Sequence, residues 1–122
     1  MSLMSTVAAT IARHIATAAD HATKDFAAVA AATSVDGALS AVYQAAETEV
    51  AAAQWATVKM LVDGGRTPVD ALRLVVEETT RQIVDQGADD NWSGRRNDLR
   101  RVRFDALRRW VQTASYMLPQ GA

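Results

Sequence analysis

Apolar residues recur every three or four positions along most of this chain, and this periodicity restricts the fold more than any other feature. The clearest run has eight such positions in the first thirty residues: Met4, Val7, Ile11, Ile15, Ala18, Ala22, Phe26 and Val29. That spacing places all of them on one face of an α-helix. The segment is also dense in alanine, the residue with the highest helix propensity. We therefore predict a helix over residues 5–33.

Short breaks divide the rest of the chain into three further helical segments. Ser34 is a candidate N-cap, because its hydroxyl can accept a hydrogen bond from a free amide of the next helix. Gly64 and Gly65 can take the left-handed conformation that ends a helix. Thr67 followed by Pro68 is typical of a helix start. With the apolar stripes between these breaks, the sequence predicts helices over residues 35–62, 68–86 and 95–117.

These four segments predict an all-α protein, because no stretch alternates with the period of two that a β-strand shows. Short connections favour an up-and-down four-helix bundle in a single domain over residues 4–118. Residues 1–3 precede a second methionine and are interpreted as a leader left from cloning, and residues 119–122 as a frayed tail. Alanine-rich seams bury little apolar area, so we expect a homodimer to complete the core.

The sequence excludes several kinds of site and location. There is no cysteine, so disulfides, thiolate metal sites and cysteine nucleophiles are absent. No secretory signal pattern and no apolar run of about 20 residues occurs. We therefore expect a cytoplasmic protein with no membrane partner.

Patterns typical of catalysis are missing. There is no Gly-x-Ser-x-Gly motif, and no phosphate-loop lysine follows the paired glycines. His14 and His21 lie about 10 Å apart along one helix, too far to share a metal ion. His21 and Asp25 have a suitable spacing, but no Glu-x-x-His motif accompanies them. We expect no cofactor and no metal, and we favour a non-enzymatic protein, with an enzyme using these three side chains as a distant alternative.

Trp55 marks a second apolar face on the helix predicted over residues 35–62. It lies opposite the stripe that begins with Leu39, and Val58 and Val62 lie on its side. A helix that is apolar on two sides is either central in its own bundle or in contact with a second partner. Tryptophan is also enriched at interaction hot spots. The sequence therefore leaves two alternatives, a central helix in a monomer or a partner interface made by Trp55, Val58 and Val62.

The charges of the chain are divided unequally. Residues 1–94 hold six Lys or Arg and twelve Asp or Glu, a net of −6, whereas residues 95–122 hold seven Arg and two Asp, a net of +5. Such a division can indicate an anionic partner. It can equally indicate a basic helix that packs against the acidic remainder of its own chain.

Three of the arginines, Arg96, Arg100 and Arg103, fall on or beside the apolar side of the predicted fourth helix. Each would need a carboxylate or a bound anion if it were buried there. The internal candidates are acids of the third predicted helix and the following break: Glu77, Glu78, Asp85, Asp89 and Asp90. The external alternative is an anion or nucleic acid, bound by Arg96, Arg100, Arg103 and Arg109. A net charge of −1 and the lack of a nucleic-acid-binding motif favour internal pairing.

Two functions are therefore consistent with the sequence. The first is a small non-enzymatic interaction protein, which self-associates or binds a protein partner through an apolar helix face. The alternative is anion or nucleic-acid binding through the arginine-rich fourth helix.

Overall fold

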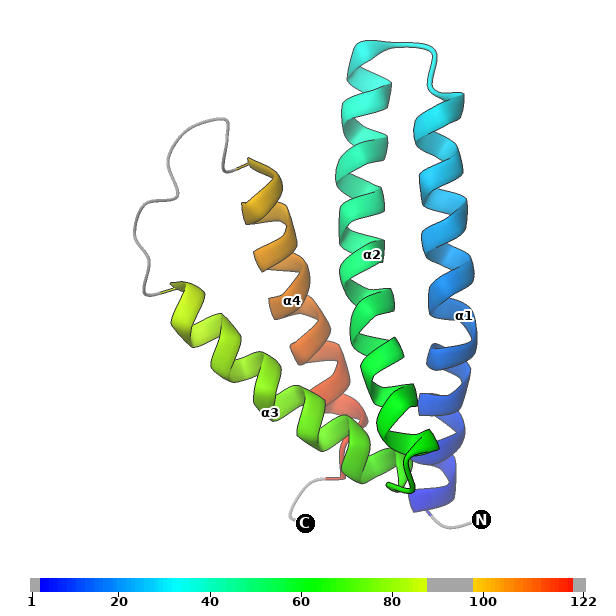
Figure 1. Cartoon of the computed structure of the whole chain (residues 1–122), viewed down its shortest axis with the longest axis vertical. Helices are drawn as coiled ribbons and strands as arrows, with labels where there is room; N and C mark the ends of the chain where they lie inside the picture. The colour runs from blue at the N-terminus through cyan, green and yellow to red at the C-terminus, as the bar shows by residue number, and fades with distance from the viewer. Residues whose placement is uncertain (1–2, 88–97, 120–122) are drawn as a thin grey trace.

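A computed structural model describes residues 3–87 and 98–119, and in these ranges it contains four α-helices and no β-strand (Figure 1). The helices are α1 (Leu3–Ala31), α2 (Val35–Asp63), α3 (Pro68–Gly87) and α4 (Asp98–Met117). The prediction of an all-α four-helix bundle is confirmed. The first three helices end within two residues of the predicted bounds, and the predicted start of the fourth lies outside the described residues.

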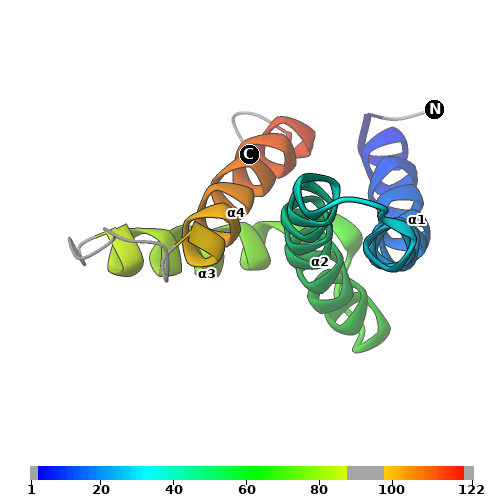
Figure 2. The same ribbon diagram turned by 90° about the horizontal axis from the view of Figure 1, so that it is seen from above.

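The helices form two antiparallel hairpins, α1–α2 and α3–α4, that are aligned at one end of the molecule. We call this end the base: α1 and α3 begin there, and α2 and α4 end there (Figure 1). Helix α2 is central, because its contacts with the other three helices are the most extensive in the bundle. Figure 2 shows it from above, between α1 and the α3–α4 pair.

Side-chain caps fix the first residues of α2 and α3. The Ser34 hydroxyl accepts a hydrogen bond from the Gly37 amide at 3.0 Å. Thr67 Oγ1 accepts one from the Asp70 amide at 3.2 Å. Each bond satisfies an amide that has no partner inside its own helix. Both N-cap predictions are thus confirmed.

The turn between α2 and α3 depends on a glycine. Gly65 has a φ of +107°, a backbone conformation that residues with a side chain rarely adopt. It lets the chain reverse so that the Arg66 amide donates to the Leu61 carbonyl at 3.1 Å. Pro68 then begins α3, where the amide hydrogen that it lacks would have had no helical partner.

The core lies at the base, where all four helices meet. Its largest fully buried side chains are Ile11 of α1, Val58 of α2 and Leu72 of α3. Helix α4 adds Trp110 and Ala114 to the same cluster. Burial of these apolar groups is the main favourable contribution to the folded state.

The α1–α2 hairpin is longer than the α3–α4 hairpin. Helices α1 and α2 have 29 residues each, whereas α3 and α4 have 20 each. At 1.5 Å per residue, the difference corresponds to about 14 Å. Because the hairpins are aligned at the base, this excess lies around the α1–α2 connection (Figure 1). We call residues 26–43, which contain this connection, the overhang.

Candidate functional site

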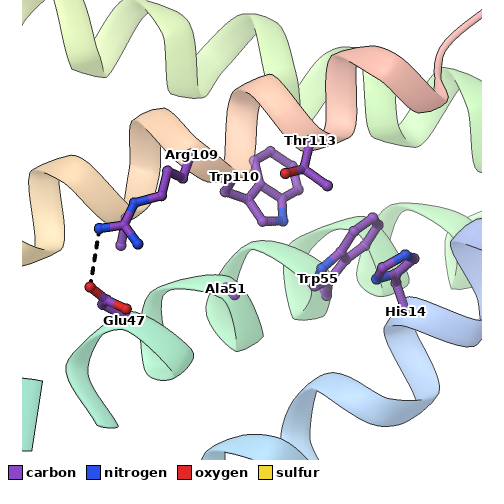
Figure 3. A pocket seen from close by; sticks show the side chains of 8 residues that line it. His14, Glu47, Ala51, Trp55, Arg109, Trp110 and Thr113 are labelled. Atoms are coloured by element: carbon purple, nitrogen blue, oxygen red, sulfur yellow. Dashed lines mark hydrogen bonds and ion pairs between the residues drawn. The ribbon is translucent and has the colours of Figure 1, made fainter. Parts of the chain in front are cut away.

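Three aromatic side chains from three helices lie in a row at the base of the bundle. Trp55 of α2 stands between His14 of α1 and Trp110 of α4 (Figure 3). The His14 and Trp55 rings are stacked, with centroids 5.0 Å apart and planes inclined by 16°. The Trp110 ring meets Trp55 at 72°, with centroids 5.4 Å apart. Both arrangements are favourable for aromatic quadrupoles.

His14 is half-buried, and its environment favours the uncharged ring. Burial against its neighbours lowers the pKa of His14 below its ordinary value, and the positive charge of Arg13 lowers it further, with a smaller contribution from His21. The imidazole is therefore neutral at neutral pH. His14 is partly exposed, and His21 is exposed.

A hollow of about 260 Å³ lies beside this row, between α1, α2 and α4 (Figure 3). Its walls are formed by the Trp55 and Trp110 rings and by the small side chains of Ala51 and Ala106. Two alanines facing each other across a helix pair leave space that larger residues would fill. The interior of the hollow is therefore mainly aromatic and apolar.

Polar groups are placed around the edge of this hollow. Arg109 Nη2 donates to Glu47 Oε1 at 3.1 Å, so the two opposite charges largely cancel. His14 and the Thr113 side chain also line the hollow. The site thus combines an apolar interior with an edge that is close to neutral.

The Trp110 indole nitrogen is a buried hydrogen-bond donor that has no acceptor in the described part of the chain. The residue is 6% exposed. Figure 3 shows this nitrogen on the side of the ring that faces α2. Leaving such a donor unsatisfied costs roughly 1–3 kcal/mol. The Trp110 ring, which forms one wall of the hollow, therefore carries an unused donor that neighbouring groups cover.

The residues predicted as a partner interface lie mostly in the core of a single chain. Trp55 is 5% exposed and Val58 0% exposed, while Val62 is half-buried beside the same cluster. This burial agrees with the alternative in which α2 is the central helix of its own bundle. Contact of these three residues with a second chain stays a prediction.

Two of the predicted anion-binding arginines have partners within the chain. Arg103 Nη2 lies 3.6 Å from Glu49 Oε2, and Arg109 pairs with Glu47. Among the described residues, the acid that pairs with Arg103 is Glu49 of α2 and not one of the predicted acids of α3, and the other two candidates, Asp89 and Asp90, lie outside the described residues. The acids of the central helix α2, rather than those of α3, lie beside this part of α4.

Arg100 and Arg103 line a second hollow of about 590 Å³ between α2, the end of α3 and α4. Val50 and Leu107 supply apolar surface there. Arg100 also interacts with other groups of the molecule. Arg96 lies outside the described residues. The hollow is therefore bordered by positive charge that is partly matched within the chain.

The overhang carries exposed apolar side chains and almost no charge. Phe26 is 52% and Leu39 49% exposed, and Val35 is more exposed than either. Asp36 is the single charged residue in positions 26–43, whereas charged residues usually make up about a quarter or more of a protein surface.

The helical periodicity of the sequence places Phe26 and Leu39 in apolar stripes that are expected to face a core. They are about half exposed because α3 and α4, which are nine residues shorter, cover this part of the hairpin only at its edge, where Arg103 of α4 lines a hollow beside Phe26. The signal was present in the sequence: the first two predicted helices are longer than the last two. Helix length, rather than periodicity, would have identified this surface.

The His21–Asp25 spacing does not develop into a metal site. The Asp25 carboxylate accepts a hydrogen bond from the Thr48 hydroxyl of α2, which joins α1 to α2. Within residues 3–87 and 98–119, no three His, Asp or Glu side chains are grouped closely enough to hold a metal ion.

Comparisons with protein-family models, with curated proteins and with solved structures find no match for this chain. Among the described helices, none is both long enough and apolar enough to cross a bilayer.

Proposed function

We propose that the protein is a small, non-enzymatic interaction protein that self-associates through the overhang. The observation that supports this most is the exposure of three apolar side chains, Phe26, Val35 and Leu39, in a segment with one charged residue. Exposed apolar surface of this kind marks interaction sites in folded proteins. A solvated helix face would instead carry Lys, Glu or Arg.

A second copy of the same overhang fits this surface well. Two helices alone bury a narrow seam, and a second hairpin packed on this face would enclose Phe26 and Leu39 in a four-helix arrangement. Such packing joins identical patches around a two-fold axis, the commonest symmetry of oligomers. Because each overhang carries one charge, two copies would meet with little like-charge repulsion.

A lipid surface is a less suitable occupant. Helices that lie on membranes usually carry Lys or Arg along their polar face, which attracts anionic lipid. Residues 26–43 contain neither. The main alternative occupant is a different protein with an apolar helix face. The molar mass of the protein at increasing concentration distinguishes this alternative from a second copy.

The test is the molar mass of the protein over a wide concentration range, measured by sedimentation equilibrium. Wild type is expected to change from monomer to dimer with increasing concentration. Phe26→Lys and Leu39→Glu each place a charge in the proposed interface and should give monomers. Both respect the helix dipole, because Phe26 is near the end of α1 and Leu39 near the start of α2.

Val84→Lys is the control, because Val84 is an apolar residue on α3, outside the overhang, and is at least as exposed as Phe26 and Leu39. It should dimerise like wild type. A wild type that stays monomeric at about millimolar concentration would reject self-association and leave a different protein as the partner. Equal dissociation by all three variants would reject the overhang as the interface.

Anion or nucleic-acid binding through Arg96, Arg100, Arg103 and Arg109 is the second proposal. The observation in its favour is the hollow that Arg100 and Arg103 border. The ion pairs of Arg103 and Arg109 with glutamates weaken it. Fluorescence anisotropy of labelled mixed-sequence DNA and RNA at low and near-physiological salt tests it, because phosphate contacts weaken steeply with salt. No binding at low salt, or binding unchanged in Arg100→Gln/Arg103→Gln, would reject this site.

A further inference from the structure

We infer that the hollow between α1, α2 and α4 binds a small, uncharged, planar aromatic molecule that carries a carbonyl-type hydrogen-bond acceptor. The hollow lies about midway along α2, from Glu47 to Trp55, and shares no lining residue with the overhang that the proposed self-association uses (Figure 3). The two functions therefore do not depend on each other.

The shape of the hollow selects a flat ligand. The Trp55 and Trp110 rings meet at 72° and form two walls of a corner. Aromatic ligands pack well against such walls, face to face with one ring and edge to face with the other. The small side chains of Ala51 and Ala106 also line the hollow and leave room for the ligand. A volume of about 260 Å³ is slightly below the usual range of ligand sites, about 300–1,000 Å³, so one or two fused rings would fill it.

The Trp110 nitrogen selects an acceptor. It is the buried donor that lacks a partner in the described part of the chain, and it faces the α2 side of the hollow (Figure 3). A ligand carbonyl that reached it would satisfy this donor, whereas a plain hydrocarbon of the same shape would not. Neighbouring side chains cover the nitrogen. We therefore expect the Trp110 ring to rotate slightly when the ligand enters.

The charges around the hollow select a neutral molecule. The Arg109 guanidinium is already matched by Glu47 at 3.1 Å. His14, whose pKa is lowered by burial, is uncharged at neutral pH. An ionised ligand would lose its hydration inside an apolar cavity without gaining an unmatched counter-charge. A neutral ketone or amide loses less hydration free energy when it enters the hollow.

The test uses 1-indanone and indane, which share the same fused rings and differ by one carbonyl group. Each is titrated into ¹⁵N-labelled full-length protein, and the tryptophan indole N–H resonances are followed by NMR. The Trp110→Phe variant identifies the Trp110 resonance. We expect 1-indanone to move that proton resonance downfield and saturably, as a new hydrogen bond requires, and indane to leave it without a downfield shift.

Two alanine substitutions on α2 provide the matched comparison. Ala51→Leu fills the hollow and should weaken 1-indanone binding by at least about tenfold, a loss of about 1.4 kcal/mol. Ala56→Leu makes the same change at an exposed position and should bind like wild type. Circular dichroism checks that both variants keep their helices.

Three results would overturn the inference. One is a Trp110 resonance that does not move at millimolar 1-indanone. Another is unchanged binding by Ala51→Leu with the fold intact. The third is tighter binding of benzoate than of 1-indanone, which would show that the site prefers an anion.

Discussion

The base and the overhang are parts of the same α1–α2 hairpin, but they differ in what covers them. At the base, α3 and α4 pack over the hairpin, and Ile11, Trp55 and Leu72 are buried. Around the α1–α2 connection the same apolar repeat continues past the ends of α3 and α4, and Phe26 and Leu39 are about half exposed. Periodicity thus specifies which face of a helix is apolar, whereas the lengths of the neighbouring helices decide whether that face is buried.

The two regions should also differ in local stability. Burial contributes roughly 25 cal/mol per Å² of apolar area, and most of that area is at the base. The overhang relies on helix propensity, on the seam between α1 and α2, and on the Ser34 cap. Regions with few buried contacts open locally at lower free energy than the core.

The largest expected contrast comes from one substitution made in both regions. Leu72→Ala at the base should lower the free energy of unfolding by about 2–5 kcal/mol, because Leu72 is fully buried and the change leaves a cavity. Leu39→Ala in the overhang should cost less than about 1 kcal/mol. Urea denaturation at a concentration where the protein is monomeric measures both. Equal losses would show that the overhang is packed as tightly as the base.

The helix caps test whether the overhang and the base open independently. Ser34→Ala and Thr67→Ala each remove one cap bond, worth about 1 kcal/mol. If the overhang opens on its own, Ser34→Ala should speed amide hydrogen exchange in residues 26–43 and leave exchange at the base unchanged. Thr67→Ala should instead affect the base. Faster exchange throughout the molecule in Ser34→Ala would show that both regions unfold together.

A smaller effect is expected from the ion pair that links α4 to α2 near the edge of the overhang. Glu49→Gln should lower the free energy of unfolding by less than about 1 kcal/mol, because both side chains are about half exposed. The loss should shrink further at high salt. Glu78→Gln, which breaks a pair within α3, is the control. A larger, salt-independent loss for Glu49→Gln would indicate a structural role for this contact.

The smallest expected effect is the change in the free energy of unfolding with pH that protonation of His14 causes. Its pKa is lowered in the folded state, so the unfolded chain takes up the proton more readily. The free energy of unfolding should therefore be highest above the ordinary histidine pKa of about 6.5 and fall as the pH drops below it. His14→Phe should reduce this fall between pH 7.5 and 5.5. A wild type that became more stable than the variant on acidification would contradict the lowered pKa.

Much of the fold could be predicted from local signals. Ser34, Thr67 and Pro68 fix where helices begin, and their caps depend on neighbours in sequence alone. The apolar stripes identified the helices, and no competing pattern pointed to strands. The exposure of Phe26 and Leu39 was missed because it depends on how the two hairpins are aligned, which no single helix encodes.

The candidate site was less predictable. The sequence singles out Trp55, but its neighbours His14 and Trp110 come from helices far away in sequence. The partners of Arg103 and Arg109 were likewise set by which helix lies beside α4. A helical wheel gives the direction of a side chain, and it gives no information about the element that the side chain meets.

Because the helices are aligned at the base, the two ends of the molecule differ. A polypeptide joined to the start of α1 or to the end of α4 would emerge at the pole opposite the α1–α2 connection (Figure 1). A 29-residue helix is about 44 Å long, so two hairpins overlapping by about 14 Å would form a rod of roughly 70 Å. Proteins attached to the two copies would be held at its far ends. Such a dimer would act as a spacer of fixed length.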